Sequence, residues 1–331
     1  MQAAYGTTAV GAVGALGWGV LMAEARLARR TIGRPTGRPP VASGSWGRGW
    51  RGTQPLRVAV LGDSSAAGLG CSTAEQTPGA LLAGGLAREL RRRVLLDVVA
   101  VVGARSADLD AQVARALRRE VHLAVVLVGA NDVTNRVVPG DAAHDLGRAV
   151  ATLRAAGAQV VVGTCPDLST VKPLLQPLRR VAAVWSRRLA RAQLVAVVEA
   201  RGAAVSLGDQ LAPEFHEQPH LWSPDRFHPS SQGYARLAAV LLPPALEALG
   251  AELPGTGLVR DSVQDVTLAA TVASRDPGLV LDTVEGAQGA AAVGPGRLVR
   301  LRRRLPLVGR GAPEGRTPSE SAAAQDEAAP R

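Results

Sequence analysis

Aromatic side chains and lysine are scarce in this sequence of 331 residues. Phe, Trp and Tyr together account for 3% of the chain, so a folded core must be built from Val, Leu and Ala. Lys172 is the single lysine among 38 basic residues, which indicates a coding bias toward Arg. With 47% hydrophobic and 20% charged residues, the composition excludes a wholly disordered chain and a polytopic membrane protein.

Cysteine is almost absent, and the patterns that bind metals or nucleotides are missing. Cys71 and Cys165 are the two cysteines, too few for a disulfide framework, and neither lies in a C-x-x-C pattern. Gly68-Leu69-Gly70 lacks the third glycine of a dinucleotide fingerprint, and no Walker pattern occurs. Four histidines show no metal-ligand spacing: His122, His144, His216 and His220. We therefore expect neither a metal nor a cofactor.

The formal net charge of +10 is unevenly distributed. Residues 1–55 hold seven Arg and one Glu, whereas residues 56–254 hold 21 basic and 18 acidic residues. The segment with periodic hydrophobicity is thus nearly balanced, and it has no basic stretch interleaved with aromatics. We therefore expect no nucleic-acid partner.

The first 23 residues carry no charge, and five arginines follow between positions 26 and 38. Residues 8–23 are apolar or small and come close to the length that a membrane-spanning helix needs. The arginines would keep the following chain inside the cell. We expect residues 1–25 to be a membrane anchor, with membrane association and a cytoplasmic catalytic domain. Two alternatives are export with cleavage near Ala25, and neither anchor nor signal.

Composition divides the rest of the chain into three parts. Residues 26–55 are rich in Arg, Pro and Gly and are expected to be a linker. Periodic patterns occupy residues 56–250, which we expect to be the folded domain. Residues 251–331 lose this periodicity and are rich in Gly, Ala, Pro and Arg, so we expect a low-complexity, disordered tail.

Apolar runs alternate with amphipathic segments within the expected domain. The runs are apolar throughout, which is typical of parallel strands buried on both faces. They lie at residues 56–61, 95–102, 123–128, 160–162 and 203–207. Helical patterns follow at 77–93, 107–119, 141–156, 174–200 and 231–242, the last expected to be interrupted by Pro243 and Pro244. The sequence therefore predicts an α/β fold, a three-layer α/β/α sandwich with a five-stranded parallel sheet.

Residues that can perform chemistry gather after the predicted strands, where parallel sheets place their sites. Ser64 and Ser65 follow the first strand, and both are candidate nucleophiles. Asp225 precedes His228 by three residues, close enough for the carboxylate to reach the imidazole. A serine at a strand-to-helix turn, a histidine and an aspartate are the parts of a catalytic triad.

Four short segments resemble the conserved blocks of the SGNH, or GDSL-type, esterase/lipase superfamily. They are Gly62-Asp63-Ser64-Ser65, Gly103, Gly129-Ala130-Asn131-Asp132 and Asp225-Arg226-Phe227-His228. They occur in the order of the family and span most of the predicted domain. Two departures are Ser65, where the family usually has Leu, and Val102, where it often has Ser. The resemblance implies a flavodoxin-like sheet and serine-dependent hydrolysis of carboxylic esters.

Carried over by position, the resemblance implies a role for each matching residue. Ser64 would be the nucleophile, His228 the base and Asp225 its partner. The oxyanion hole would consist of the N–H groups of Ser64 and Gly103 and the side-chain amide of Asn131. The substrate would be a small-molecule, lipid or carbohydrate ester.

Other interpretations of the sequence stay open. One is a carbohydrate acyltransferase or deacetylase on the same triad, which differs in the acceptor or the alcohol. The others belong to different classes: a non-catalytic nucleotide-binding module and a membrane-anchored interaction module. The nucleotide-binding module would need an acidic residue about 20 positions after a Gly-rich loop, and Glu89 and Asp97 are poorly placed for it.

Overall fold

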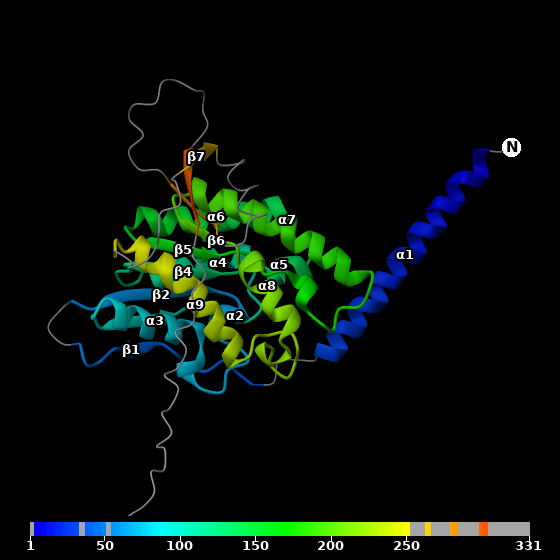
Figure 1. Ribbon diagram of the computed structural model, residues 1–331. Helices are drawn as coiled ribbons and strands as arrows, with labels where there is room; N and C mark the ends of the chain where they lie inside the picture. Colours follow the sequence, from blue (N-terminus) through cyan, green and yellow to red (C-terminus); the bar gives the residue numbers. More distant parts are fainter. Residues whose placement is uncertain are drawn as a thin grey trace, which may run out of the picture.

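The computed structural model describes residues 3–32, 37–50, 54–251, 262–265, 279–283 and 298–303. Within them, a twisted sheet forms the middle layer and helices cover both of its faces (Figure 1). The predicted α/β class and the three-layer arrangement are confirmed.

Five parallel strands form the centre of the sheet. They are β2 (Leu56–Gly62), β3 (Val94–Val98), β4 (Leu123–Leu127), β5 (Gln159–Gly163) and β6 (Ala203–Val205). Their order is β3-β2-β4-β5-β6, and each neighbouring pair is parallel. These are the five strands that the sequence predicts. Because they are parallel, all five carboxyl ends meet at one edge of the sheet, where the candidate residues lie.

The sheet is wider than predicted, because antiparallel strands extend both of its sides. β1 (Gly44–Trp46), which lies inside the predicted linker, pairs with β3. On the other side β6 pairs with β8 (Leu279–Thr283), followed by β9 (Leu298–Arg303) and β7 (Ser262–Asp265). The described part of the chain thus contains nine strands. Most other residues of the predicted tail lie outside the described residues, and the domain boundaries stay predictions.

Two groups of helices cover the sheet. On one face lie α3 (Pro78–Glu89) and α9 (Ser231–Ala248), which pack onto β2, β3 and β5 through side chains such as Leu86 and Leu241. On the other face lie α4 (Leu109–Ala116), α6 (Pro139–Ala155) and α7 (Leu178–Glu199), which pack together through side chains such as Leu146 and Val197. In Figure 1, α6 and α7 lie side by side near β5 and β6, and α3 and α9 lie side by side near β2. Both cores consist largely of Val, Leu and Ala, as the composition requires.

Two helices differ from the predicted pattern. α9 continues through Pro243 and Pro244 to Ala248, because Leu241, Ala245 and Leu246 stay buried against the sheet. This packing outweighs the backbone hydrogen bonds that the prolines cannot donate. α8 (Leu207–Glu217) follows β6 directly and was not predicted.

The start of α3 offers a test of local stability. The Thr77 hydroxyl accepts a hydrogen bond from the Ala80 N–H at 3.3 Å and donates to the Ala74 carbonyl at 2.7 Å. Thr77→Ala should lower the free energy of unfolding by about 1 kcal/mol. Thr77→Ser keeps the hydroxyl and should lose less than half as much in urea denaturation. Equal losses in the two variants would show that the methyl group matters and not the cap.

The prediction that residues 1–25 form a membrane anchor is wrong. Residues 3–32 form one helix, α1 (Ala3–Ile32), which runs through Ala25 without a break. In the described part of the chain, no helix combines the length and the apolar character needed to cross a membrane. Glycines at positions 11, 14, 17 and 19 dilute the apolar stretch, and Glu24 and Arg26 follow it in the same helix.

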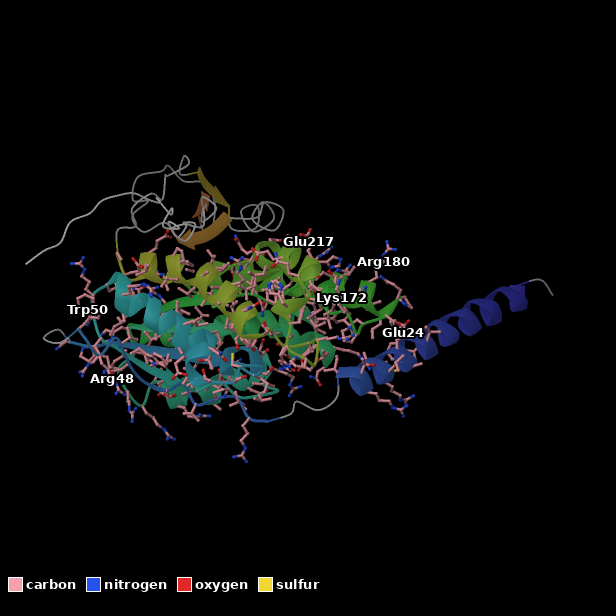
Figure 2. The ribbon with its side chains drawn as sticks, turned by 60° about the horizontal axis from the view of Figure 1, so that its bottom comes forward. Glu24, Arg48, Trp50, Lys172, Arg180 and Glu217 are labelled. Atoms are coloured by element: carbon pink, nitrogen blue, oxygen red, sulfur yellow. The ribbon has the colours of Figure 1, made fainter. Side chains whose placement is uncertain are left out.

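The second half of α1 contacts the body of the protein. The Glu24 carboxylate accepts a hydrogen bond from the Leu178 N–H at 2.8 Å, at the first residue of α7. The Arg136 guanidinium lies over the Trp18 ring, 5.2 Å from its centroid. Figure 2 shows Glu24 where α1 leaves the body of the molecule, at the same end as Arg180 of α7.

Candidate active site

A tight turn joins β2 to the short helix α2 (Ser64–Ala67). Gly62 has φ +130°, and a Cβ atom there would lie 1.8 Å from the Leu127 carbonyl oxygen. The turn therefore requires glycine at this position. Asp63 caps α2, because its carboxylate accepts a hydrogen bond from the Ser65 N–H at 2.8 Å. These contacts place Ser64 just past the carboxyl end of β2.

The two candidate serines have different partners. The Ser64 Oγ lies 3.0 Å from the His228 Nε2, and the side chains of both residues are largely buried. The Ser65 hydroxyl instead donates to the Asp63 carboxylate. The structure thus brings Ser64, and not Ser65, to the histidine.

His228 is held by a compact loop before α9. Asp225 Oδ2 lies 2.6 Å from His228 Nδ1, and Asp225 Oδ1 accepts hydrogen bonds from the N–H groups of Phe227 and His228 at 2.9 Å. The Ser223 hydroxyl also donates to Asp225 Oδ1, at 2.6 Å. Arg226 turns the chain with φ +56°. The loop therefore fixes the carboxylate and the imidazole together.

The charge of Asp225 decides the tautomer of His228. Burial acts to raise the pKa of Asp225, but hydrogen bonds from His228, Ser223 and the two backbone N–H groups outweigh it and hold the pKa well below its usual range. The carboxylate is therefore ionised near neutral pH and can only accept hydrogen bonds. Nδ1 of His228 must carry the proton, which leaves Nε2 free to accept the proton of Ser64.

The three predicted oxyanion donors are not placed alike: Ser64 and Asn131 line one cavity, whereas Gly103 is exposed in the loop after β3 and does not line it. The N–H groups of Ser64 and Gly103 donate to no acceptor among the residues that the structure describes. Asn131, in α5 (Ala130–Thr134), donates one amide hydrogen to the Ala104 carbonyl at 3.0 Å. This contact orients the amide, and a second hydrogen remains on the same nitrogen.

Two other carboxylates hold the loops in place. The Asp63 carboxylate accepts hydrogen bonds from the N–H and the hydroxyl of Ser65, and burial raises the pKa of Asp63. The Asp132 carboxylate accepts hydrogen bonds from the N–H and the hydroxyl of Ser106, and burial raises its pKa as well. Asp132 thereby joins the loop after β3 to α5.

A cavity of about 100 Å³ begins at Ser64 and His228. Asn131 also lines it. Beyond these residues the cavity runs along the carboxyl ends of β4 and β5 to α8, and its walls are mostly apolar. An elongated apolar group can therefore reach the Ser64 hydroxyl.

The sequence analysis did not predict two residues that hold parts of the site in place. Gln112 of α4 contacts both backbone groups of Gly62, and Ser223 contacts Asp225. Nothing in the local sequence marks Gln112, because its partner lies 50 positions away. Within the described ranges, no group of three or more His, Cys, Asp or Glu side chains is arranged to hold a metal ion.

Several known proteins are similar to this chain. Residues 60–236 match the model of the GDSL-like Lipase/Acylhydrolase family. A GDSL-like esterase of Mycobacterium tuberculosis is 41% identical over 245 residues, which cover 71% of this chain and 78% of that protein. The crystal structure of TesA is 24% identical with a TM-score of 0.46, covering 59% of this chain and 99% of that chain. A mutant of Axe2, an acetyl-xylooligosaccharide esterase from Geobacillus, is 19% identical with a TM-score of 0.44, covering 60% and 95%.

Proposed function

The chain belongs to the GDSL-like lipase/acylhydrolase family, and on that premise we propose that it hydrolyses carboxylic esters through an acyl-enzyme intermediate on Ser64. The observation that carries this proposal is the continuous chain of contacts from Ser64 Oγ to His228 Nε2, at 3.0 Å, and from His228 Nδ1 to Asp225 Oδ2, at 2.6 Å.

Acylation proceeds from this arrangement in two proton transfers. His228 Nε2 takes the proton of Ser64 as the Oγ attacks the ester carbonyl carbon. The tetrahedral intermediate collapses when His228 returns that proton to the departing alcohol oxygen. Ionised Asp225 stabilises the imidazolium that exists between these two transfers.

Deacylation repeats the sequence with water. His228 takes a proton from a water molecule, and the resulting hydroxide attacks the acyl carbonyl. The carboxylic acid departs when Ser64 Oγ regains its proton from His228. The enzyme thereby returns to its starting state, and no external oxidant or reductant is needed.

The negative charge on the carbonyl oxygen needs hydrogen-bond donors that are already in place. The N–H groups of Ser64 and Gly103 and the Asn131 amide would form this oxyanion hole. Support comes from Ser64 and Asn131, which line the same cavity, and from the Ala104 contact that orients Asn131.

Partitioning of the acyl group tests the acyl-enzyme directly. Esters of one acid with p-nitrophenol, phenol and naphthol are hydrolysed in water containing methanol. If one acyl-enzyme lies on the pathway, the ratio of methyl ester to free acid is the same for all three leaving groups. A ratio that changes with the leaving group contradicts the intermediate.

The side chain of Asn131 should matter mainly in the transition state. Asn131→Ala is expected to lower kcat by about 10²–10³-fold with little change in KM, because one oxyanion donor is lost. Gln232→Ala is the control, since it removes the same kind of amide group from an exposed position in α9. Steady-state kinetics on one short ester measures both. An Asn131→Ala enzyme within threefold of wild type would remove this residue from the oxyanion hole.

A further inference from the structure

The cavity beside Ser64 collects the scarce aromatic residues of the chain. The sequence contains only two phenylalanines, Phe215 and Phe227, and both line this cavity together with Trp222. Phe215 and Trp222 pack edge to face with their ring centroids 5.0 Å apart. In a protein whose core is built from Val, Leu and Ala, this concentration marks an apolar surface on one side of the candidate nucleophile.

Aliphatic side chains from several elements complete the wall. β4 contributes Leu127, and α8, which packs beside α9 (Figure 1), contributes Leu211. The segment after β5 adds Leu168 and Val171. Such a lining favours a hydrocarbon chain, because each buried methylene gains free energy by leaving water.

The polar side chains on the distal wall already have partners inside the protein. The Thr164 hydroxyl donates to the Val205 carbonyl at 3.3 Å, and the Thr170 hydroxyl donates to the Asp167 carbonyl at 2.7 Å. The Asp167 carboxylate accepts hydrogen bonds from the Arg187 guanidinium at 2.8 and 3.0 Å and from the Ser169 N–H. A sugar in this part of the cavity would bury hydroxyl groups without matching partners, which is costly.

Resting on the proposed function, we propose that this cavity binds the acyl chain of esters of straight-chain aliphatic acids. The acyl group stays on Ser64 through both steps, whereas the alcohol must leave and water must enter in between. A pocket lined by α8 and mostly apolar suits the part that stays. With a cavity of about 100 Å³ and roughly 10–15 Å³ needed per water-sized group, acyl chains of roughly seven to ten carbons fit.

Two residues of α8 limit the length of the chain. Leu211 is buried and Ala212 half-buried, and both line the cavity. A larger side chain at 212 shortens the available space, and a smaller one at 211 extends it. Ala235, on the exposed side of α9, provides a matched control for the Ala-to-Phe change.

The experiment compares two series of esters with the full-length protein. In the first, the p-nitrophenyl group is constant and the acyl chain grows from two to twelve carbons. In the second, the acyl group is acetyl and the alcohol grows. For wild type, kcat/KM should rise about three- to fourfold per added methylene up to the limit of the cavity and then fall. The alcohol series should show no such optimum.

Ala212→Phe should lower the ratio of kcat/KM for the octanoyl ester to that for the acetyl ester at least tenfold. Leu211→Ala should move the optimum to longer chains, and Ala235→Phe should leave the profile as in wild type. Thermal denaturation identifies a variant that has not folded. If Ala212→Phe does not fold, the wild-type profile and the opposite shift in Leu211→Ala still show whether the cavity binds the acyl chain. An optimum in the alcohol series, or a ratio unaffected by Ala212→Phe, overturns the proposal.

The proposed function and this inference fail in different ways. If Ser64→Ala hydrolyses esters as well as wild type does, the proposed function fails. If hydrolysis depends on Ser64 but is flat along the acyl series, only the acyl-chain proposal falls.

A second inference rests on a separate observation, the side chain of Gln112. It is buried in α4, and its amide contacts both backbone groups of Gly62: Oε1 accepts from the N–H at 2.7 Å, and Nε2 donates to the carbonyl at 2.9 Å. Gly62 lies two residues before Ser64. We infer that Gln112 is a positioning residue, which fixes the turn and thereby the direction of the Ser64 hydroxyl.

Gln193 gives a matched control for Gln112. It is buried in α7 and makes the same kind of double contact, with the Cys165 N–H at 2.7 Å and the Val128 carbonyl at 3.1 Å. Gln112→Met should lower kcat at least tenfold with KM within threefold, and Gln112→Glu, which keeps an acceptor for the Gly62 N–H, should recover part of it. Gln193→Met should lose similar thermal stability with kcat within threefold. Equal losses of kcat in the two Met variants would show that Gln112 acts on stability alone.

Discussion

Replacing Ser64 with Ala is expected to lower kcat/KM for ester hydrolysis by about 10⁴-fold or more, because no oxygen remains to form the acyl-enzyme. Ser64 Oγ has His228 Nε2 at 3.0 Å, an acceptor for its proton. Ester hydrolysis by the purified variant, compared with wild type on the same substrate, measures the effect.

Ser65→Ala is the matched control for this change. Ser65 is adjacent in the same helix, but its hydroxyl contacts the Asp63 carboxylate and not the histidine. We expect Ser65→Ala to retain activity within about tenfold of wild type, because loss of one hydrogen bond to a charged group weakens the turn only modestly. Reversed effects, with Ser65→Ala inactive and Ser64→Ala active, would move the nucleophile to Ser65.

Replacing Asp225 with Asn should be nearly as severe, with a loss of about 10⁴-fold in kcat. The ionised carboxylate requires the proton of His228 to be on Nδ1, since it can only accept. An amide in its place can present an N–H group to Nδ1, which moves the histidine proton to Nε2. The imidazole then cannot accept the proton of Ser64, although the loop keeps nearly the same shape.

Asp209→Asn controls for the general effect of removing the charge of a half-buried carboxylate. The Asp209 carboxylate also accepts a hydrogen bond from a serine, Ser206, at 2.6 Å, but it has no histidine partner in the described structure. Its kcat should stay within threefold of wild type. An Asp225→Asn enzyme that is as active as Asp209→Asn would exclude a role of Asp225 in orienting His228.

The parallel core could be predicted because burial on both faces leaves a direct mark on a strand. Leu123–Leu127 is apolar at every position and is fully buried in β4. β1 leaves no such mark, since its three residues lie in a segment rich in Pro and Gly and are at most half-buried. The strands β7–β9 could not be predicted either, because they lie in a segment without hydrophobic periodicity.

Ser64 and Asn131 could be picked out because each follows a strand of a parallel sheet, whereas Asp225 and His228 lie in the loop before α9 and were marked by their spacing. The structure brings Ser64 and His228 together although they are 164 positions apart. It also distinguishes the two candidate nucleophiles, because Ser64 contacts His228 and Ser65 contacts Asp63, a choice that the sequence alone left open. Gln112 and the apolar cavity could not be predicted, since both depend on which side chains meet in the folded protein. The membrane prediction failed because it counted the length of an uncharged stretch and gave too little weight to its glycines.

Labelling of the full-length protein with a fluorophosphonate, followed by mass spectrometry of its peptides, is the most direct test of serine catalysis. We predict one covalent adduct, on Ser64, that forms much more slowly in Asp225→Asn and is absent from Ser64→Ala. An adduct on Ser65, or an unlabelled protein that still hydrolyses esters, would contradict the assignment of Ser64 as the nucleophile.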